Sequence, residues 1–385
     1  MIKEYDYAVV GGGMVGAATA VGLAKLGHSV VLLEAREPAV YDKAQPMDIR
    51  VSAISQSSVD LLDSLGAWKF ISETRVCPYK RLETWEHPEC RTRFHSDALN
   101  MDQLGFIVEN RLIQLGLWNE FSQYSNLNVL TPININTITF HQEYNELTLS
   151  DNSVLKAKWV IGADGANSYV RQQAKIGITA WDYRQHCMLI NIETEQEQQD
   201  ITWQWFTPSG PRSFLPLFGN KGSLVWYDSP TRIKQLTAMS NTQLEEQIKR
   251  HFPAELGGFK VERFGSFPLT RRHAQQYVNH RCVLLGDAAH TINPLAGQGV
   301  NLGFKDVNVF LEEAEKNGVE SDKAPSRYES RRRTDNLLMQ TSMDVFYTLF
   351  SNTLPPVKLL RNIGLRAAES AGPLKTQALK YALGL

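Results

Sequence analysis

The chain has 385 residues, of which 43% are hydrophobic and 21% charged, with 40 Lys and Arg against 41 Asp and Glu. This length predicts two or three domains, and the composition excludes a disordered chain. The formal net charge of −1 argues against a nucleic-acid-binding protein, which would carry a basic surface.

The spacing of cysteine and histidine gives no sign of a disulfide framework or a metal site. The four cysteines include no Cys-x-x-Cys pair, and the nine histidines include no His-x-x-x-His pair. No apolar run approaches the roughly 18 residues that suggest a membrane span. The N-terminus enters a predicted strand without a secretory signal. We therefore expect a cytoplasmic α/β enzyme with reduced cysteines and no bound metal.

The first 34 residues predict a strand, a glycine-rich turn, a helix and a second strand. The apolar run 5–10 precedes Gly11-Gly12-Gly13-Met14-Val15-Gly16, residues 17–26 have a helical pattern, and the apolar run 29–33 ends at Glu34. A Gly-x-Gly-x-x-Gly sequence in this βαβ context is typical of dinucleotide binding.

Each glycine of this turn has a separate expected task. Gly11 permits the tight turn, Gly13 lets the backbone approach a pyrophosphate, and Gly16 lets the helix pack close to the sheet. The pyrophosphate would lie at the positive N-terminus of the helix. Glu34 follows Gly16 by 18 residues, where a carboxylate can accept hydrogen bonds from ribose hydroxyls. The unit predicts a bound dinucleotide, either NAD or FAD.

Further elements follow in the middle of the chain. We expect helices over about Ser52–Leu65 and Asn110–Tyr124, then a β-rich stretch whose last strand ends at Asp164-Gly165, and a short helix over Ala166–Ala174. Residues 181–228 hold nine aromatic side chains among alternating polar residues and Pro/Gly turns. This pattern predicts an antiparallel sheet and a second domain.

The last third returns to a strand, a loop and helices. A buried strand over 282–285 ends in Gly286-Asp287, and Gly297-Gln298-Gly299 opens a helix that continues to about Lys316. From about Ala324 the pattern is helical, with a break at Pro355-Pro356.

Three motifs now stand in order: Gly11-x-Gly13-x-x-Gly16, Asp164-Gly165, and Gly286-Asp287 followed by Pro294 and Gly297-Gln298-Gly299. This order resembles the single-component flavin aromatic hydroxylases of the para-hydroxybenzoate hydroxylase type. Further runs resemble the ubiquinone-biosynthesis branch of that family; they are 48–55, 81–86, 226–230, 267–274, 286–290, 294–303 and 377–385. The likeness extends over essentially the whole chain.

The resemblance implies an α/β fold in which a Rossmann-like FAD-binding domain carries an inserted antiparallel-sheet substrate domain and a C-terminal helical segment. We expect the FAD-binding domain in 1–73, 97–180 and 272–345. The substrate domain would comprise 74–96 and 181–271, and the C-terminal helices 346–385.

The family likeness also implies a set of residues that hold FAD tightly but without a covalent bond. Glu34 would hold the adenosine ribose, and Asp287 the ribityl or pyrophosphate region. Pro294 would lie near the flavin ring. The helix that begins at 297–299 would point its N-terminus at the pyrimidine edge, where it favours the anionic reduced flavin. The full expected set is Gly11, Gly13, Met14, Val15, Gly16, Glu34, Arg50, Arg111, Asp164, Gly165, Gly286, Asp287, Pro294, Gly297, Gln298, Gly299, Val300 and Asn301.

The implied activity is hydroxylation of the ring of a polyprenylated benzoquinol, demethoxyubiquinol, in ubiquinone biosynthesis. NAD(P)H would dock transiently as electron donor, since the chain has one dinucleotide fingerprint, and O2 would supply the oxygen. The flavin itself carries the chemistry at C4a, so no catalytic side chain is assigned; the histidines His273 and His290 are expected to be structural.

Three alternatives remain open. Another hydroxylase of the same branch would act at a different ring position, and a flavin oxidase or dehydrogenase would insert no oxygen. A non-catalytic prenyl-binding scaffold on the same fold would hold no flavin. The Gly286-Asp287 and Gly297-x-Gly299 elements argue against the scaffold.

The C-terminal segment Asn352–Leu385 differs in charge from the rest of the chain. It has five Lys and Arg residues against the single acid Glu369, a local charge of +4, and its leucines recur at helical spacing. Basic amphipathic helices of this kind can lie on an anionic membrane surface. We expect peripheral contact with the inner face of a membrane, or with other proteins of a quinone-biosynthesis complex.

Overall fold

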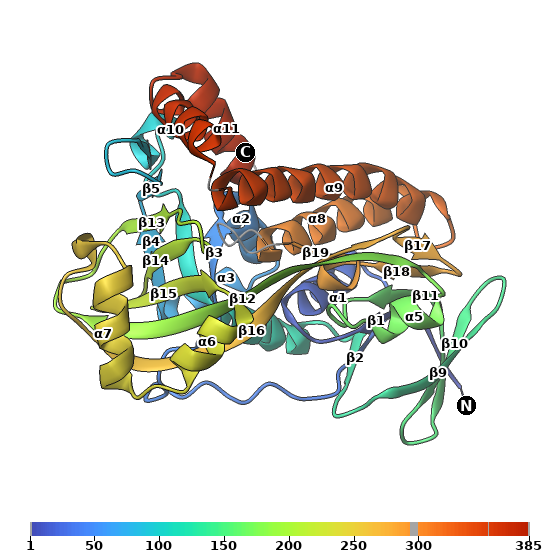
Figure 1. Ribbon diagram of the computed structural model, residues 1–385. Helices are drawn as coiled ribbons and strands as arrows, with labels where there is room; N and C mark the ends of the chain where they lie inside the picture. The colour runs from blue at the N-terminus through green and yellow to red at the C-terminus, as the bar shows by residue number, and fades with distance from the viewer. Residues whose placement is uncertain (1, 293–298, 353, 384–385) are drawn as a thin grey trace.

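A largely parallel sheet forms one half of the molecule in this computed structural model, which describes residues 2–292, 299–352 and 354–383 (Figure 1). Its order is β17-β18-β11-β1-β2-β8, and β10 and β9 extend it beside β11. The strands are β1 (Lys3–Val10), β2 (Val30–Leu33), β8 (Leu127–Leu130), β9 (Ile135–Phe140), β10 (Asn145–Leu149), β11 (Val154–Gly162), β17 (Val278–Asn279) and β18 (Cys282–Leu284).

The first strand, helix and second strand form the predicted βαβ unit. Strand β1 pairs in parallel with both β2 and β11, and α1 (Met14–Lys25) connects β1 to β2. Helix α1 is buried from Gly16 to Ala24, because the sheet covers one side and α8 (Gly299–Asn317) the other. A Cβ on Gly22 would lie 2.3 Å from Leu311 of α8. Small residues thus let three layers pack closely, and the Rossmann-like expectation is confirmed.

A second, mostly antiparallel sheet forms the other half, as the aromatic-rich stretch predicted. Its order is β19-β16-β12-β15-β14-β13-β5-β6. The strands are β5 (Arg81–Trp85), β6 (Arg91–His95), β12 (Ile178–Thr194), β13 (Ile201–Trp205), β14 (Arg212–Pro216), β15 (Lys221–Asp228), β16 (Phe259–Ala274) and β19 (His290–Thr291).

The long strands β12 and β16 run from the second sheet into the parallel half (Figure 1). The expected domain boundaries at 180/181 and 271/272 fall inside these two strands. The division into domains stays a prediction. Of the aromatics in 181–228, Trp203, Phe214 and Trp226 are buried in the core of the second sheet, whereas Trp181 and Phe218 are exposed.

A small sheet corrects one expected helix. Strands β3 (Val51–Ser55), β7 (Gly105–Glu109) and β4 (Val76–Tyr79) pair in the order β3-β7-β4. The helix expected from Ser52 therefore begins only at Gln56, as α2 (Gln56–Ser64). Residues 52–55 form a strand because the distant β7 offers its backbone to them, a pairing that local sequence does not reveal.

The other predicted helices are present, with shifts at their ends. Helix α4 runs over Asn110–Asn119 and continues as a short 3-10 turn, while α5 begins at Tyr169 because the Ser168 hydroxyl caps it by accepting the N–H of Arg171. The remaining helices are α3 (Trp68–Thr74), α5 (Tyr169–Gln173), α6 (Pro230–Thr237), α7 (Asn241–His251), α9 (Lys323–Ser351), α10 (Pro355–Glu369), α11 (Pro373–Leu383) and the 3-10 turns η1 (Ser96–Leu99), η2 (Glu120–Gln123), η3 (Ala254–Leu256) and η4 (Gly286–Ala288).

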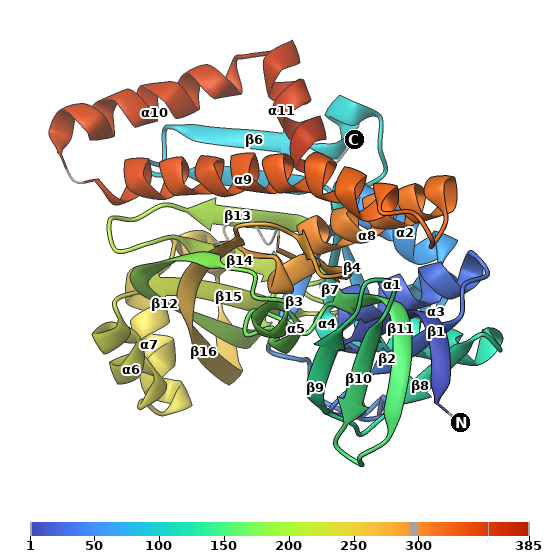
Figure 2. The ribbon, with the colours of Figure 1, turned by 90° about the vertical axis from the view of Figure 1, so that its right-hand side faces the viewer.

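A buried ion pair fastens α10 to the end of strand β5. The Arg361 guanidinium donates to both carboxylate oxygens of Glu86, with Nε 2.7 Å from Oε2, and also to the carbonyls of Leu349 and Asn352. Arg361 and Glu86 are both buried. Figure 2 shows α10 at the outer edge of the molecule beyond β6 and α9. The contact therefore sets which side of α10 faces the protein.

Glu86→Ala should release α10, because Arg361 would stay buried without its counter-charge. Breaking one partner of a buried pair costs about 3–5 kcal/mol. We expect a lower free energy of unfolding and faster tryptic cleavage after Lys358 and Arg366. Glu246→Ala serves as control: its pair with Lys249 is exposed, and such pairs contribute about 0–1 kcal/mol. Equal cleavage rates in the two variants would contradict the anchoring role.

Candidate functional site

The turn between β1 and α1 depends on two glycines. Gly11 has φ +100°, and a Cβ there would lie 2.5 Å from the Ala163 carbonyl oxygen. A Cβ on Gly16 would lie 1.8 Å from the Gly11 carbonyl oxygen. No side chain fits at either place, so these glycines are required by the fold itself, as predicted for the tight turn and the close helix.

Gly13 differs from its neighbours because space is open beside it. A Cβ there would meet no described atom within 4 Å, and its φ of −68° is accessible to any residue. Gly13 is the N-cap of α1 and no side chain caps the helix. The first N–H groups of α1 therefore face an open space beside Gly13, an arrangement suited to a phosphate.

Gly12 is held on both sides of its peptide group. Its N–H donates to the Glu34 carboxylate, and its carbonyl accepts from Gln114 Nε2 at 2.7 Å and Trp118 Nε1 at 2.8 Å. The other Glu34 oxygen accepts the Arg36 N–H at 2.8 Å. Sequence reasoning missed Gln114 and Trp118, although their spacing of four on α4 places them on one helix face. These contacts fix the shape of the turn.

Asp164 follows β11 beside the same turn. One carboxylate oxygen accepts the N–H groups of Tyr169 at 2.6 Å and Val170 at 3.1 Å, and so caps α5. The other oxygen is buried and has no partner among the described residues. Burial raises the pKa of Asp164. One oxygen thus serves the fold, while the second is enclosed and unpaired among the described residues; Gly165 follows at φ +79°.

The Gly286-Asp287 turn approaches the glycine turn from β18. Gly286 has φ +60°, and a Cβ there would lie 3.0 Å from Val15 of α1. The Asp287 side chain is exposed to solvent, yet surrounding protein raises its pKa and the nearby charges of His290 and Arg50 oppose that rise. A carboxylate that solvent reaches but protein surrounds lies in a concave surface.

A buried network of hydrogen bonds and ion pairs holds the Gly286-Asp287 turn in place. One oxygen of Asp306 accepts the Gly286 N–H at 3.0 Å and bonds His290 Nε2, and the other accepts from Arg332 Nε at 2.8 Å and Asn336 Nδ2 at 3.1 Å. His290 and Arg332 hold the pKa of Asp306 well below its usual range, against its burial. Sequence reasoning missed Asp306 and Arg332, which no local motif marks. His290 takes part in this buried network; that it has no catalytic part stays a prediction.

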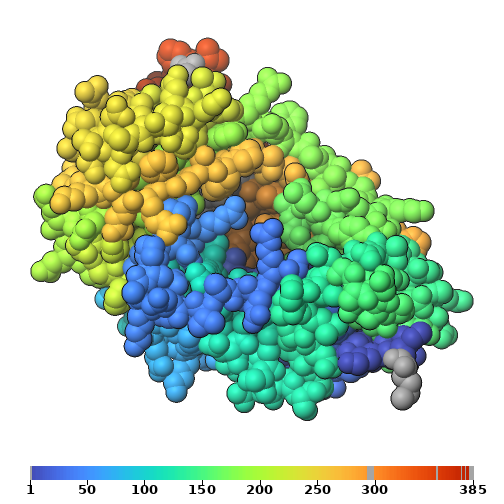
Figure 3. Space-filling model, turned by 90° about the horizontal axis from the view of Figure 1, so that it is seen from below, coloured from blue at the N-terminus to red at the C-terminus, as the bar shows by residue number. Residues whose placement is uncertain are grey.

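Arg50 lies between this turn and the second sheet. Its guanidinium stands over the Phe267 ring of β16, 5.3 Å from the centroid. The preceding backbone is fastened to β12, because Asn191 Nδ2 donates to the carbonyls of Met47 at 3.1 Å and Asp48 at 3.0 Å. Figure 3 shows a hollow in the surface of the protein. Its floor is orange; blue atoms border it on one side, and green and orange atoms border it on the others. We call this hollow the groove. The Gly286 turn lies against Val15 of α1, and the backbone at Ala163 and Asp164 lies against Gly11, so three of the predicted turns come together. The placing of the other predicted residues around the groove stays a prediction.

Similar known proteins identify the family of this chain. A family model described as "FAD binding domain" matches residues 4–333. The chain belongs to this FAD-binding family. It is 50% identical to 3-demethoxyubiquinol 3-hydroxylase of Escherichia coli over 385 residues, 99% of this chain and 98% of the relative. Ubiquinone hydroxylase UbiL of Rhodospirillum rubrum is 34% identical, over 99% of this chain and 90% of that protein. The predicted flavin-hydroxylase family is confirmed.

Solved structures of two monooxygenases are similar to this chain in fold. The p-nitrophenol 4-monooxygenase of Pseudomonas putida superposes with a TM-score of 0.80 at 19% identity, covering 100% of this chain and 99% of that chain. A probable FAD-dependent monooxygenase of Pseudomonas aeruginosa gives 0.78 at 18% identity, covering 94% and 99%. At this identity the likeness concerns the fold alone.

The groove fits FAD by its own chemistry. The open side of Gly13 and the free N–H groups of α1 suit a pyrophosphate, Glu34 stands at the end of β2 where an adenosine ribose would lie, and the Asp287 carboxylate can accept from hydroxyls. Among the described residues, no three His, Cys, Asp or Glu side chains gather as metal ligands would.

Other expected cofactor residues have structural partners of their own. Arg111 donates to the carbonyls of Ala39 at 2.6 Å and Val40 at 2.9 Å, so it holds the loop after β2. The Asn301 amide bonds the Ala53 carbonyl and the Ser55 N–H, and so ties α8 to β3. Direct contact of these residues with FAD stays a prediction, as it does for Met14, Gly299 and the half-buried Val300. Pro294, Gly297 and Gln298 lie outside the described residues.

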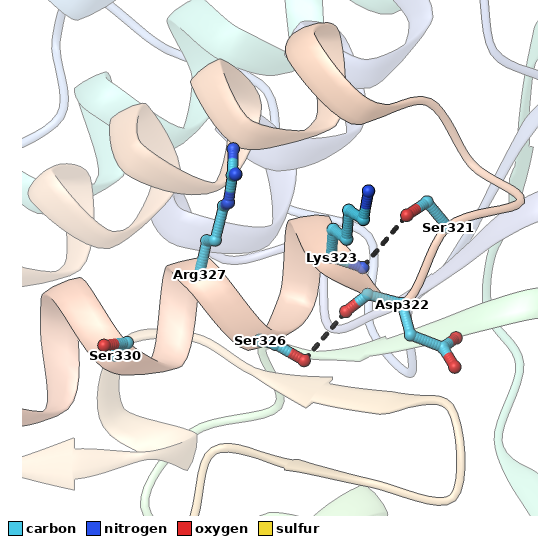
Figure 4. Close-up of a pocket in the computed structure, with 6 residues that line it drawn as sticks. All are labelled: Ser321, Asp322, Lys323, Ser326, Arg327 and Ser330. Carbon is cyan, nitrogen blue, oxygen red and sulfur yellow. Dashed lines mark hydrogen bonds between the residues drawn. The ribbon is translucent and has the colours of Figure 1, made fainter.

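A hollow of about 580 Å³ lies elsewhere, at the start of α9 (Figure 4). It is lined by Ser321, Asp322, Lys323, Ser326, Arg327 and Ser330. Lys323 and Arg327 extend away from each other in Figure 4 and converge on no common point. This open surface shares no residue with the groove and has no role in the site.

Gly13→Val should abolish FAD retention while leaving the fold intact. The side chain would occupy the space that the pyrophosphate needs, and the backbone already has an allowed φ. We expect at least about a tenfold loss of bound FAD, measured by flavin absorbance after gel filtration. Gly364→Val on α10 is the matched control, because a Cβ there also meets no described atom. Equal FAD content in the two variants would place the cofactor elsewhere.

His273 should make stability depend on pH. Burial lowers its pKa to about 4 from an ordinary 6.5, and neither ring nitrogen has a hydrogen-bond partner among the described residues. The unfolded chain therefore takes up this proton first as pH falls. The stability that the neutral imidazole contributes is present above pH 6.5 and is lost between about pH 6.5 and 4, up to about 3 kcal/mol.

The matching variant is His273→Leu, which has no proton to bind. Its free energy of unfolding should fall less steeply than that of the intact chain between pH 7 and pH 4. Urea denaturation at several pH values measures both curves. Parallel curves would show that His273 does not titrate in this range.

Proposed function

We propose that this protein is an FAD-dependent monooxygenase that hydroxylates the ring of demethoxyubiquinol, a polyprenylated benzoquinol, with NAD(P)H and O2. The observation that carries the proposal is 50% identity with the E. coli 3-demethoxyubiquinol 3-hydroxylase over nearly the full length of both chains. The open groove at Gly13 supports it, since a scaffold without flavin has no need of that space.

The residues of this chain would bind and orient the cofactor. The N–H groups at the start of α1 would hold the pyrophosphate, and Glu34 would accept from the adenosine ribose in place of its present backbone donors. Asp287 would bind hydroxyls of the ribityl chain. When bound, reduced FAD activates O2 and supplies the oxygen atom that enters the ring.

The protein would contribute position and exclusion of water rather than a general base. His290 is bonded to Asp306, and His273 is a buried residue of β16. Neither ring is free to exchange a proton with a substrate in the groove. Arg50 and Phe267 stand where the cofactor groove meets the second sheet, so the quinol ring would enter between them and the flavin.

NAD(P)H would act as a transient electron donor. The described residues contain one glycine turn of the dinucleotide-binding kind, and FAD would fill it. The reductant would therefore use the open groove for a short time rather than a fold of its own. We propose that the Asp164-Gly165 turn, whose backbone lies against Gly11, contacts it.

A second candidate is another hydroxylation of the same quinol ring. It is favoured by the similarity to UbiL and to the ubiquinone biosynthesis monooxygenase COQ6 of Xenopus tropicalis, which is 32% identical over 98% of this chain and 93% of that protein. Mass spectrometry of quinone intermediates in a strain without this protein separates the two. A precursor that lacks a different oxygen would move the reaction to another ring position.

The long prenyl tail of the substrate resides in a bilayer. No helix among the described residues has the length and apolar character needed to cross one. We propose that the protein works from the cytoplasmic side, in peripheral contact with the membrane or with other proteins of quinone biosynthesis.

Flavin reduction by NAD(P)H should be slow without a quinol and at least about tenfold faster with a short-tailed demethoxyquinol, because reduction without substrate wastes reduced flavin on O2. Stopped-flow bleaching of the flavin measures both rates. The same mixture under isotopically labelled O2 should yield a quinol with one labelled oxygen. Equal rates would remove gating by substrate, and absence of labelled product would remove the hydroxylase assignment.

A further inference from the structure

Most of the exposed large apolar side chains of this protein fall in one stretch of the sequence, on two neighbouring helices. Nine of the thirteen large apolar side chains that are exposed in the described structure lie between residues 337 and 363. We name this region the outer apolar patch; it consists of Leu337, Leu338, Val345, Phe346 and Leu349 on α9, Leu354 in the connection, and Leu359, Leu360 and Ile363 on α10.

Helix α10 presents its apolar side outward. Leu359, Leu360 and Ile363 recur at the spacing of one helix face and are 63%, 69% and 55% exposed. The opposite side carries the buried Arg361. A surface helix of a globular protein ordinarily buries its apolar face against the core, so the orientation of α10 is the reverse of the usual one.

Polar contacts fix this orientation. Arg361 is held by Glu86, Asn362 Nδ2 donates to the same carboxylate at 2.7 Å, and the Leu365 carbonyl accepts from Thr92 at 2.9 Å. Turning the apolar face inward would break a buried ion pair and leave charges unpaired. The patch is therefore a lasting feature of the surface, and Figure 1 and Figure 2 both place α10 at the outer edge of the molecule.

Helix α11 behaves differently from α10. Leu379 is 3% exposed and belongs to a core cluster with Tyr79 and Leu104. The last helix therefore anchors the C-terminal segment to the protein. Of the basic amphipathic segment 352–385 expected from the sequence, α10 is the part left open to a partner.

The charges beside the patch identify its occupant. Arg366 is exposed one helical turn from Ile363. Lys358 lies toward the inner side of α10, with Nζ 4.0 Å from Glu86 Oε1, although its side chain is 52% exposed. Segment 352–385 carries +4 in a chain of net charge −1, so the remainder carries −5. A second copy docked on the patch would bring these cations against their own counterparts. An anionic bilayer surface would bury the leucines and attract the cations.

We propose that the outer apolar patch docks this protein on the surface of an anionic lipid bilayer. The inference rests on the proposed function, because a hydroxylase of a prenylated quinol must reach a substrate dissolved in that bilayer. The patch enters the interfacial layer with α10 lying flat, and Arg366 contacts lipid phosphate.

Flotation of the full-length, FAD-loaded protein with vesicles tests the proposal. Intact protein should float with phosphatidylcholine vesicles that contain phosphatidylglycerol, and less with phosphatidylcholine alone. The triple variant Leu359→Gln, Leu360→Gln, Ile363→Gln should lose at least about tenfold in vesicle binding. The control Ile2→Gln, Phe218→Gln removes two exposed apolar side chains outside the patch and should bind as the intact protein does.

Charge and activity give separate measurements. Arg366→Gln should weaken binding to anionic vesicles, and added salt should do the same because it screens surface charges. FAD content and hydroxylation of a short-tailed, water-soluble quinol should stay unchanged in the triple variant, since none of its positions lies in the groove.

The outcomes separate docking from function. Vesicle binding by the triple variant equal to that of the intact protein would overturn the docking proposal while leaving the hydroxylase assignment in place. Binding lost as expected, with no quinol hydroxylated by any form, would overturn the proposed function alone. An intact protein that ignores vesicles but becomes a smaller oligomer in the triple variant would make the patch an interface between copies, and would also overturn docking.

Discussion

The close approach of three backbone segments around Val15 is the constraint on which the groove depends. A Cβ on Gly303 would lie 2.6 Å from Val15 Cγ2, and one on Gly286 would lie 3.0 Å from the same atom. Only glycine at both places lets α8 and the Gly286-Asp287 turn come so near to α1. This packing brings Asp287 beside the glycine turn that residues 11–16 form near the start of the chain.

A buried network around Asp306 then holds the Gly286-Asp287 turn in the position that the glycines make possible. Asp306 lies beneath the Gly286 turn and is fully enclosed, with His290, Arg332 and Asn336 supplying its partners. A buried carboxylate is tolerated only when donors surround it. The network therefore holds the Gly286-Asp287 turn in one position. The exposed Asp287 is thus oriented by residues that are themselves buried. Arg361 and Glu86 do the same for α10, whose outward apolar face follows from that ion pair.

The second sheet shapes the other wall of the groove. Strands β12 and β16 are long enough to run through both halves, so the groove lies against a continuous sheet rather than across a flexible linker. Asn191 fastens the backbone at Met47 and Asp48 to β12, and Arg50 reaches from there to Phe267. Cofactor and quinol would meet at this junction. The aromatic side chains that mark the sheet in the sequence mostly pack its core.

Local patterns in the sequence determined much of this protein. The βαβ unit, the tasks of Gly11 and Gly16, the antiparallel sheet and the C-terminal helices could be predicted because each depends on neighbouring residues and on periods of two or 3.6. The family likeness then added the cofactor and the expected set around it. The structure leaves open space beside Gly13, and the approach of a pyrophosphate there stays a prediction.

Only the tertiary structure decided the rest. Residues 52–55 form a strand because β7, more than fifty residues away, pairs with them. Gln114, Trp118, Asp306 and Arg332 carry no local motif, and they matter because folding brings them to Gly12 and Gly286. The direction of the apolar face of α10 was likewise beyond the sequence. The spacing of apolar residues shows that a helix has an apolar and a polar face. Which face is buried depends on the partner of the helix, here Glu86, and long-range packing sets that partner.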